Sequence, residues 1–530
     1  MILNFLNSRF FLVFLLPLTL GTLTVFSFQP FNHNYINFLI FPAIFLLIIY
    51  VKKKSKNTYR KKPYILNLFL IGYLFGVGFF FTGTSWISHS LTFDESFKFL
   101  IPISLVALPL FLGIFFGLGN LISGLFIKNN LTSILLFSSS YAFMDFLRAK
   151  ILTGFPWNLW AYTWSWVPET LQFLPILGFF SFNLICIIFY CSPLLLIFRK
   201  KFNLIFFTFI VIIFFGNFIY GSSIIKKNDN FLKKIKLNSG NSIFTKIISP
   251  NFDIKYNLSD EDIGKKVLKL IKYSEPDTNK KTLFIWPEGI FTGFNFDEIK
   301  QYKNIFEENF SKNHLILFGI NTVNDNQAEA KTFNSLLIIN NKFDILFKYD
   351  KTKLVPFGEF LPFENILSNL GIKKITEGYG SFSKGGEGKI FLLDKLKLLP
   401  LICYEIIFPE LSKNQEQKNL IVNISEDAWF GKSIGPNQHL AKAIFRSVEN
   451  NVFLVRSANK GFSAFIDNKG VIKKVLRPDE VGVIELEVPL INNLQIKYEI
   501  NLIFFILLFT CAFVFIIFKK NENKKLFIHK

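Results

Sequence analysis

Eight apolar runs constrain the fold of this chain more than any other feature of its sequence. They occur near residues 10–28, 35–51, 64–87, 99–126, 132–148, 171–198, 203–224 and 499–518. A helix needs about 20 apolar residues to cross the hydrocarbon core of a bilayer. Because 51% of the 530 residues are hydrophobic, the composition excludes an ordinary soluble globule. We therefore expect a multi-pass membrane protein with one long polar insert before the last run.

Basic residues in the short segments between the runs predict the orientation of the chain. The segments on the side that holds both termini carry seventeen Lys and Arg residues. Those on the opposite side carry three, at Lys98, Arg148 and Lys150. By the positive-inside rule the termini face the cytoplasm. Large domains are exempt from that rule, so we expect the insert on the outer side of the membrane.

The runs and the insert predict three parts. Residues 1–225 are expected to hold seven transmembrane helices, 226–496 an extracytoplasmic domain, and 497–530 the last helix with a basic tail. The first run lacks a small-residue cleavage site, so we expect it to remain as an anchor. The net charge of +21 does not call for nucleic acid, because the basic residues lie beside apolar runs where anionic headgroups attract them.

The insert alternates between short β-type runs and helical patterns. Helical patterns lie near 260–274, 297–309 and 436–450. The β-type runs are 243–249, 282–286, 314–320, 332–340, 343–348, 396–403, 419–424, 452–456, 461–466 and 482–487. Such alternation is typical of an α/β or mixed layered domain.

Cys403 is the cysteine that chemistry in the insert could use. The other three, Cys186, Cys191 and Cys511, lie inside apolar runs, and no CxxC metal motif or disulfide framework is present. Cys403 ends a buried β-type run and is followed by Tyr404 and Glu405. A single cysteine in such a place is more often a small core residue than a nucleophile.

Two further β-type runs end in ionisable residues. One breaks at Pro287 into Glu288, and the other is followed by Lys351 and Glu359. A thiol is mostly protonated at neutral pH, so a nucleophilic cysteine needs a carboxylate to take its proton and a cation to favour the thiolate. Glu288 and Lys351 offer both. Lys351 and the backbone N–H after Cys403 could also face an oxyanion.

His439 is the alternative base, in an arrangement of the papain type, but it lies near the start of an expected helix.

These motifs together resemble the nitrilase superfamily and, within it, the apolipoprotein N-acyltransferases. The resemblance rests on Trp286-Pro-Glu288, Lys351 to Glu359, Cys403-Tyr-Glu405, Asp427-Ala-Trp-Phe-Gly431 and the seven-plus-one arrangement of spans. It implies a polytopic α-helical membrane domain and a four-layer α-β-β-α insert. It also implies that Glu288 is the general base, Lys351 the oxyanion-stabilising cation and Cys403 the nucleophile, with Glu359, Tyr404 and Glu405 supporting them.

The resemblance further implies an activity. An acyl chain would pass from a membrane phospholipid, expected to be phosphatidylethanolamine, through a thioester to the N-terminal amine of the diacylglyceryl-cysteine of an apolipoprotein. The expected location is the bacterial inner membrane, and no metal or cofactor is implied. Two alternatives remain: a membrane-tethered nitrilase-like amidase, and a scaffold or transporter whose insert has lost catalysis. An intact Glu288, Lys351 and Cys403 argue against the last.

Aromatic residues supply candidates for lids and lipid contacts. Tyr256 takes the place where the family has a lid tryptophan, and Phe357, Trp429 and Phe430 could cover the opening of the site. Ordinary buried loop residues are the alternative. Trp157 ends a Gly-Phe-Pro-Trp turn in the membrane part that could form either an interfacial aromatic belt or a wall of a lipid site.

Overall fold

The structure is a computed structural model in which the chain forms two compact units. The helical unit comprises Met1–Thr92, Lys98–Ser222 and Ile496–Lys530, and the two-sheet unit comprises Phe93–Phe97 and Ser223–Gln495. The structure describes residues 2–58, 63–199, 201–237, 240–255, 258–324, 331–367, 381–413, 417–491 and 500–528.

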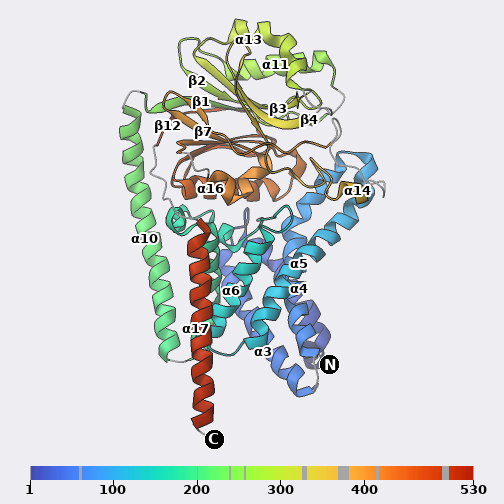
Figure 1. The fold of residues 1–530 in the computed structure, drawn as a ribbon, viewed down its shortest axis with the longest axis vertical. Helices are drawn as coiled ribbons and strands as arrows, with labels where there is room; N and C mark the ends of the chain where they lie inside the picture. Colours follow the sequence, from blue (N-terminus) through green and yellow to red (C-terminus); the bar gives the residue numbers. More distant parts are fainter. Residues whose placement is uncertain are drawn as a thin grey trace. The chain divides into compact units, whose positions relative to one another are not determined.

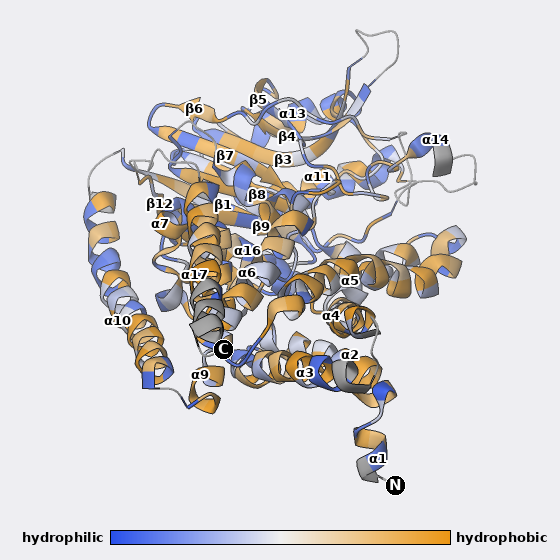
Figure 2. Cartoon of the chain, turned by 60° about the horizontal axis from the view of Figure 1, so that its bottom comes forward, coloured by the Kyte–Doolittle hydropathy of each residue, from blue (hydrophilic) through white to orange (hydrophobic). Residues whose placement is uncertain are grey.

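Long apolar helices make up the helical unit, and Figure 2 shows hydrophobic residues along most of them. Such helices have no polar face, because both the lipid and the neighbouring helices are apolar. The principal elements are η1 (Phe10–Leu15), α2 (Leu16–Leu23), α3 (Asn37–Thr58), α4 (Pro63–Thr84), α5 (Ile101–Phe126), α6 (Leu131–Arg148), α8 (Phe179–Cys191), α9 (Pro193–Ile197), the first part of α10 (Lys201–Leu237) and α17 (Ile500–Ile528).

Among the described residues, seven helical segments are long and apolar enough to cross a membrane. They correspond to seven of the eight predicted spans. The run at 132–148 forms α6, which is not among the seven because it carries three consecutive serines as well as Asp145 and Arg148. Most of α6 is buried by neighbouring helices, which is where polar residues of membrane helices usually lie.

Asp145 pairs with Arg148 inside the helical unit, and Arg148 also holds the Gly-Phe-Pro-Trp turn. Arg148 Nη2 donates to Asp145 Oδ1 at 3.0 Å, and Nη1 donates to the carbonyl oxygens of Phe155 and Trp157 at 2.6 and 2.8 Å. Trp157 and Trp160 are at most 1% exposed. Because their rings are buried inside the helical unit, these two tryptophans do not form an interfacial belt.

Two six-stranded sheets form the two-sheet unit. The first has the order β12-β1-β2-β3-β4-β5 and the second the order β11-β10-β9-β8-β7-β6. In each sheet three neighbouring strands run parallel, β1-β2-β3 and β7-β8-β9. The strands are β1 (Ser242–Ser249), β2 (Thr282–Ile285), β3 (His314–Asn324), β4 (Lys331–Ile339), β5 (Ile345–Asp350), β6 (Phe391–Leu393), β7 (Leu396–Ile402), β8 (Leu420–Glu426), β9 (Phe453–Asn459), β10 (Ser463–Ile466), β11 (Ile472–Leu476) and β12 (Gly482–Pro489).

Helices cover the outer face of each sheet, so this unit has four layers (Figure 1). Helices α11 (Asp260–Ser274), α12 (Phe296–Ile299) and α13 (Lys303–Asn309) pack on the first sheet, and α16 (Gly435–Asn450) packs on the second. One apolar core lies between the two sheets and a second lies under α11 to α13. The predicted α-β-β-α architecture is confirmed.

The sequence prediction missed two strands of this unit, β6 and β11. Phe391–Leu393 has only three residues, and two of them are exposed. Ile472–Leu476 carries two lysines and has no buried residue. They are the two opposite edge strands of the second sheet, where β6 pairs with β7 and β11 pairs with β10. Neither has the apolar periodicity that identifies a strand, so backbone pairing defines them instead.

Candidate active site

Glu288 lies just after β2 and is anchored by two hydrogen bonds. Its Oε1 accepts from Asn334 Nδ2 at 2.8 Å, and its Oε2 accepts from the backbone N–H of Glu426 at 3.0 Å. The residue is 7% exposed. Because Glu426 belongs to β8, these bonds tie the end of the first sheet to the end of the second. The carboxylate is therefore held at the meeting point of two parallel strand ends.

Lys351 follows β5 and reaches both neighbouring carboxylates. Its Nζ lies 2.8 Å from Glu359 Oε1 and 3.5 Å from Glu288 Oε1, and the side chain is 1% exposed. Burial lowers the pKa of Lys351, but the carboxylates of Glu359 and Glu288 outweigh burial and raise it above its usual value. The ammonium is therefore a fixed positive charge inside the site.

Cys403 begins a 3-10 turn, Cys403–Ile407, directly after β7. Its φ is +47°, in the left-handed region that residues other than glycine rarely occupy. Such a conformation at a strand end turns the side chain out of the regular pleat, and strained positions of this kind concentrate at active sites. The residue is 9% exposed.

The thiol of Cys403 is not a preformed thiolate. Burial raises the pKa of the Cys403 thiol, the Glu288 carboxylate raises it further, and the Lys351 ammonium acts in the opposite direction. The expectation that the cation would favour the thiolate is correct in sign, but burial and the carboxylate outweigh it. These mutual effects also place the three side chains at one site. The thiol must therefore lose a proton before it can act as a nucleophile, and Glu288 is a carboxylate whose charge acts on it.

Glu405 joins the loop of Cys403 to the loop of Lys351. Its Oε2 accepts from the N–H of Ile402 at 2.8 Å, while Oε1 accepts from the N–H of Thr352 at 2.7 Å and from Tyr349 Oη at 2.9 Å. Burial raises the pKa of the Glu405 carboxyl, and these hydrogen bonds oppose that rise. These contacts hold the end of β7 close to the end of β5.

Glu359 and Asn334 complete the cluster. Glu359 Oε1 accepts from Asn334 Nδ2 at 2.7 Å in addition to its contact with Lys351, and Oε2 accepts from the N–H of Val355 at 2.8 Å. The single amide of Asn334 therefore bridges two carboxylates that would otherwise repel each other. The sequence interpretation missed Asn334, because a polar residue within β4 is ordinary. No sequence signal singles it out, since Lys331, Thr332 and Ser335 of the same strand are polar too.

His439 does not fit the papain-like alternative. Its Nε2 lies 3.3 Å from the carbonyl oxygen of Cys403, and its Nδ1 lies 3.1 Å from Asp427 Oδ1 and 2.9 Å from Arg456 Nη2. Burial, and then the charge of Arg456, lower the pKa of His439 to about 4. Both ring nitrogens therefore contact groups other than the thiol.

Comparison with known proteins agrees with this architecture. Residues 20–192 match the family described as Apolipoprotein N-acyltransferase N-terminal domain, and residues 253–493 match the family Carbon-nitrogen hydrolase. An apolipoprotein N-acyltransferase of Allorhizobium ampelinum is 32% identical over 79% of this chain and 79% of that protein. One of Rickettsia prowazekii is 31% identical over 89% of this chain and 91% of that protein.

This chain belongs to the apolipoprotein N-acyltransferase family. The resemblance drawn from its motifs is therefore confirmed. In this family member, Glu288, Lys351 and Cys403 all lie inside the Carbon-nitrogen hydrolase match. Among solved structures, Saccharomyces cerevisiae Nit3, a member of branch 10 of the nitrilase superfamily, is 15% identical with a TM-score of 0.35, covering 47% of this chain and 90% of that chain.

The remaining candidates of this N-acyltransferase family member have different surroundings. Tyr404 packs against Phe408 with ring centroids 5.1 Å apart. Phe357 is 45% exposed and has a φ of +63°. Trp429 contacts Phe93 at 4.8 Å between ring centroids.

Three other candidates stay predictions as substrate or lid residues. Phe430 is 7% exposed, and its ring packs against His439 at 5.2 Å. Trp157 lies in the helical unit. Tyr256 lies outside the described residues.

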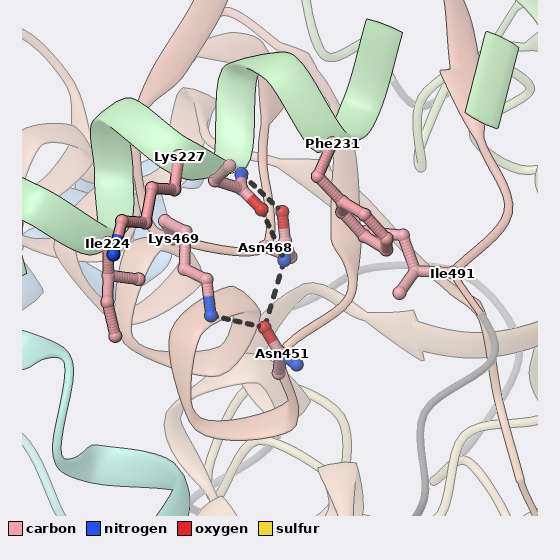
Figure 3. Close-up of a pocket in the computed structure, with 8 residues that line it drawn as sticks. Ile224, Lys227, Phe231, Asn451, Asn468, Lys469 and Ile491 are labelled. Carbon is pink, nitrogen blue, oxygen red and sulfur yellow. Dashed lines mark hydrogen bonds between the residues drawn. The ribbon is translucent and has the colours of Figure 1, made fainter. Parts of the chain in front are cut away.

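An open cavity of about 310 Å³ lies elsewhere in the two-sheet unit (Figure 3). Asn228 and Asn468 exchange side-chain hydrogen bonds of 2.9 and 3.2 Å at its edge, so they fasten the second half of α10 to the turn after β10. None of the candidate site residues lines this cavity. Among the described residues, no group of three or more His, Cys, Asp or Glu side chains is arranged to hold a metal ion.

Proposed function

We infer that this chain transfers an acyl chain from a membrane phospholipid to the N-terminal amine of a diacylglyceryl apolipoprotein, by way of a thioester on Cys403. The convergence of Glu288, Lys351 and Cys403 in one buried cluster is the observation that supports this proposal. Phosphatidylethanolamine is the donor we expect. The names of the relatives support the acceptor class.

In the first half-reaction Glu288 takes the thiol proton while the sulfur attacks the ester carbonyl of the phospholipid. The resulting oxyanion faces the Lys351 ammonium and the backbone N–H of Tyr404. Collapse of the tetrahedral intermediate breaks the ester C–O bond. The leaving lysophospholipid oxygen takes the proton from Glu288, and the acyl chain remains on Cys403.

In the second half-reaction the amine of the acceptor attacks the thioester carbonyl. Glu288 takes a proton from the attacking nitrogen, the same oxyanion site is used, and the C–S bond breaks. The proton on Glu288 then returns to the sulfur, so the enzyme is regenerated. Because both substrates carry lipid chains and use one thiol, the kinetics should be ping-pong.

Labelled phospholipid without acceptor tests this proposal. Wild-type protein should accumulate a hydroxylamine-sensitive acyl group on the peptide that contains Cys403, and Cys403→Ala should accumulate none. Addition of a diacylglyceryl peptide should then discharge the label onto the peptide's N-terminus. An unlabelled Cys403 together with intersecting double-reciprocal lines would replace this mechanism by direct transfer in a ternary complex.

We also propose that the protein lies in the bacterial inner membrane with its two-sheet unit on the periplasmic side. The distribution of Lys and Arg among the short segments supports this orientation.

A further inference from the structure

The backbone at Cys403 needs an external restraint. A φ of +47° is unfavourable for a cysteine, and the residue sits where the chain changes from β7 to a 3-10 turn. Surroundings must impose such a conformation if it is to persist. The carboxylate of Glu405 holds the N–H of Ile402, on one side of the cysteine. The carbonyl of Cys403 itself is held by a different group of residues.

That group is the buried cluster of His439, Asp427 and Arg456. His439 comes from α16, Asp427 follows β8 and Arg456 lies on β9. Arg456 Nη2 donates to both carboxylate oxygens of Asp427, at 2.9 and 2.8 Å, and lies 2.9 Å from His439 Nδ1. All three side chains are at most 1% exposed. The cluster is therefore shielded from solvent and pairs its two charges internally.

The hydrogen-bond partners determine which nitrogen of His439 carries the proton. Nδ1 lies 2.9 Å from a guanidinium, which can only donate, and 3.1 Å from Asp427 Oδ1, which can only accept, so these two contacts alone do not decide its protonation. The carbonyl oxygen of Cys403 can only accept, which requires a hydrogen on Nε2. The single proton of a neutral imidazole then lies on Nε2, where it donates to the carbonyl oxygen of Cys403 at 3.3 Å. The lowered pKa of His439 keeps the ring neutral at neutral pH. The ring therefore offers one N–H, and that N–H points at the nucleophile's backbone.

The carbonyl of Cys403 and the N–H of Tyr404 belong to one peptide group. A peptide group is planar, and in the trans form its C=O and N–H point in opposite directions. The only cis bond among the described residues is Gln29–Pro30, so the Cys403–Tyr404 peptide is trans. A group that fixes the carbonyl of Cys403 therefore also fixes the direction of the Tyr404 N–H.

We propose that His439, held by Asp427 and Arg456, is a positioning residue that orients the Cys403–Tyr404 peptide so that its N–H faces the oxyanion. This inference rests on the proposed acyl transfer, in which the oxyanion forms beside Cys403. It gives a role to Asp427 of the Asp-Ala-Trp-Phe-Gly motif, which takes no part in the proton transfers described above.

Two reactions of the same thiol test the inference. Acylation by labelled phospholipid forms an oxyanion, whereas alkylation by iodoacetamide displaces iodide at a saturated carbon and forms none. His439→Ala should lower the single-turnover acylation rate by about 100-fold, the effect of losing one oxyanion donor. Its iodoacetamide rate should stay within about threefold of wild type, since the thiol and its charged neighbours are intact.

His314→Ala is the matched control. His314 is also a buried histidine of the two-sheet unit, 1% exposed, and its Nε2 lies 2.8 Å from the carbonyl oxygen of Asp277 at the far end of β3. Loss of that contact should leave both reactions of Cys403 near wild-type rates. Equal loss of acylation in the two variants would show that removal of any buried histidine has this effect, which would overturn the inference.

Two conservative variants keep the test valid if His439→Ala does not fold. A glutamine amide can reach the position of Nε2, whereas an asparagine amide reaches only the position of Nδ1. His439→Gln should therefore restore acylation to within about tenfold of wild type, and His439→Asn should not. Equal acylation by these two variants, or equal loss of acylation and alkylation, would refute a role in orienting the peptide. If wild type forms no thioester, the proposed function itself fails.

Discussion

At the scale of single residues, opposing charges control the reactivity of Cys403. Glu288 raises the pKa of the thiol and Lys351 lowers it, while burial raises it most. A buried thiol that stays protonated at rest is protected from oxidation and from adventitious electrophiles. In the proposed mechanism, base and nucleophile therefore act as a pair.

Replacement of the base should separate thiol reactivity from catalysis. Because the negative charge of Glu288 raises the pKa of Cys403, Glu288→Gln should lower that pKa. More thiolate should then be present at pH 8, and iodoacetamide should modify Cys403 faster than in wild type. Acyl transfer should fall by at least about 100-fold, since no group accepts the proton.

Mass spectrometry of the Cys403 peptide measures the alkylation rate. Glu307→Gln, which removes an exposed carboxylate on α13, should change neither rate. Slower alkylation of Glu288→Gln than of wild type would contradict the assigned electrostatics.

Lys351 should not be replaceable by arginine. Its ammonium is 1% exposed and fits between two carboxylates at 2.8 and 3.5 Å. The larger planar guanidinium directs its donors differently and does not fit a space shaped for a compact cation. Lys351→Arg should therefore lower the acylation rate by about 100-fold or more. Lys348→Arg, on the strand β5 that precedes Lys351 and partly exposed beside Asp350, should remain near wild type. Near-normal acylation by Lys351→Arg would show that the lysine only balances charge.

At the scale of elements, parallel strands bring the site together. The carboxyl ends of β2 and β7 carry Glu288 and Cys403 to facing edges of two stacked sheets. The contact between these edges depends on the absence of a side chain at one position of β3. A Cβ added at Gly319 would lie 2.9 Å from Glu288 Cα and 3.0 Å from Ile424 Cδ1. The spacing of the sheets at the site therefore requires glycine there.

Gly319→Ala should consequently impair acylation more than it impairs folding. Overpacking of this kind costs about 1–3 kcal/mol of stability, while displacement of the Glu288 backbone should lower the acylation rate about tenfold or more. Thermal unfolding and single-turnover acylation measure the two effects.

Gly482→Ala is the matched control, because that strand glycine has its nearest neighbour at an ordinary 3.5 Å. If Gly319→Ala retains full acylation, the sheets do not need this close approach.

At the scale of the whole molecule, the proposal states which side of the membrane each part of the chain faces. The proposed orientation can be tested by a membrane-impermeant maleimide on variants with one engineered cysteine. Asn279→Cys lies at an exposed turn of the two-sheet unit and should react from outside in sealed cells. Asn523→Cys, in the C-terminal tail, should react only after the membrane is permeabilised. Wild-type protein is the background control, since its four cysteines are buried. External labelling of residue 523 would reverse the orientation.

Local patterns in the sequence determined much of the secondary structure and most of the candidate site residues of this protein. Apolar runs of membrane-spanning length, strands that end in Glu288, Lys351 or Cys403, and the helix at 436–450 are all visible in short windows. The helices and strands are predictable because buried elements need apolar side chains at a fixed period. The site residues are predictable because an ionisable residue directly after a buried strand departs from that period. The weakly patterned strands β6 and β11 were missed for the same reason.

Contacts between distant residues were decided only by the tertiary structure. The bridge from Asn334 to Glu288 and Glu359 joins positions 46 and 25 residues apart, and the bond from His439 to the carbonyl of Cys403 spans 36. Polar residues of these kinds are common in any sequence, and their roles depend on which partner the fold places beside them. The protonation state of Cys403 also follows from the tertiary structure, because desolvation arises only when the sheets close over the thiol.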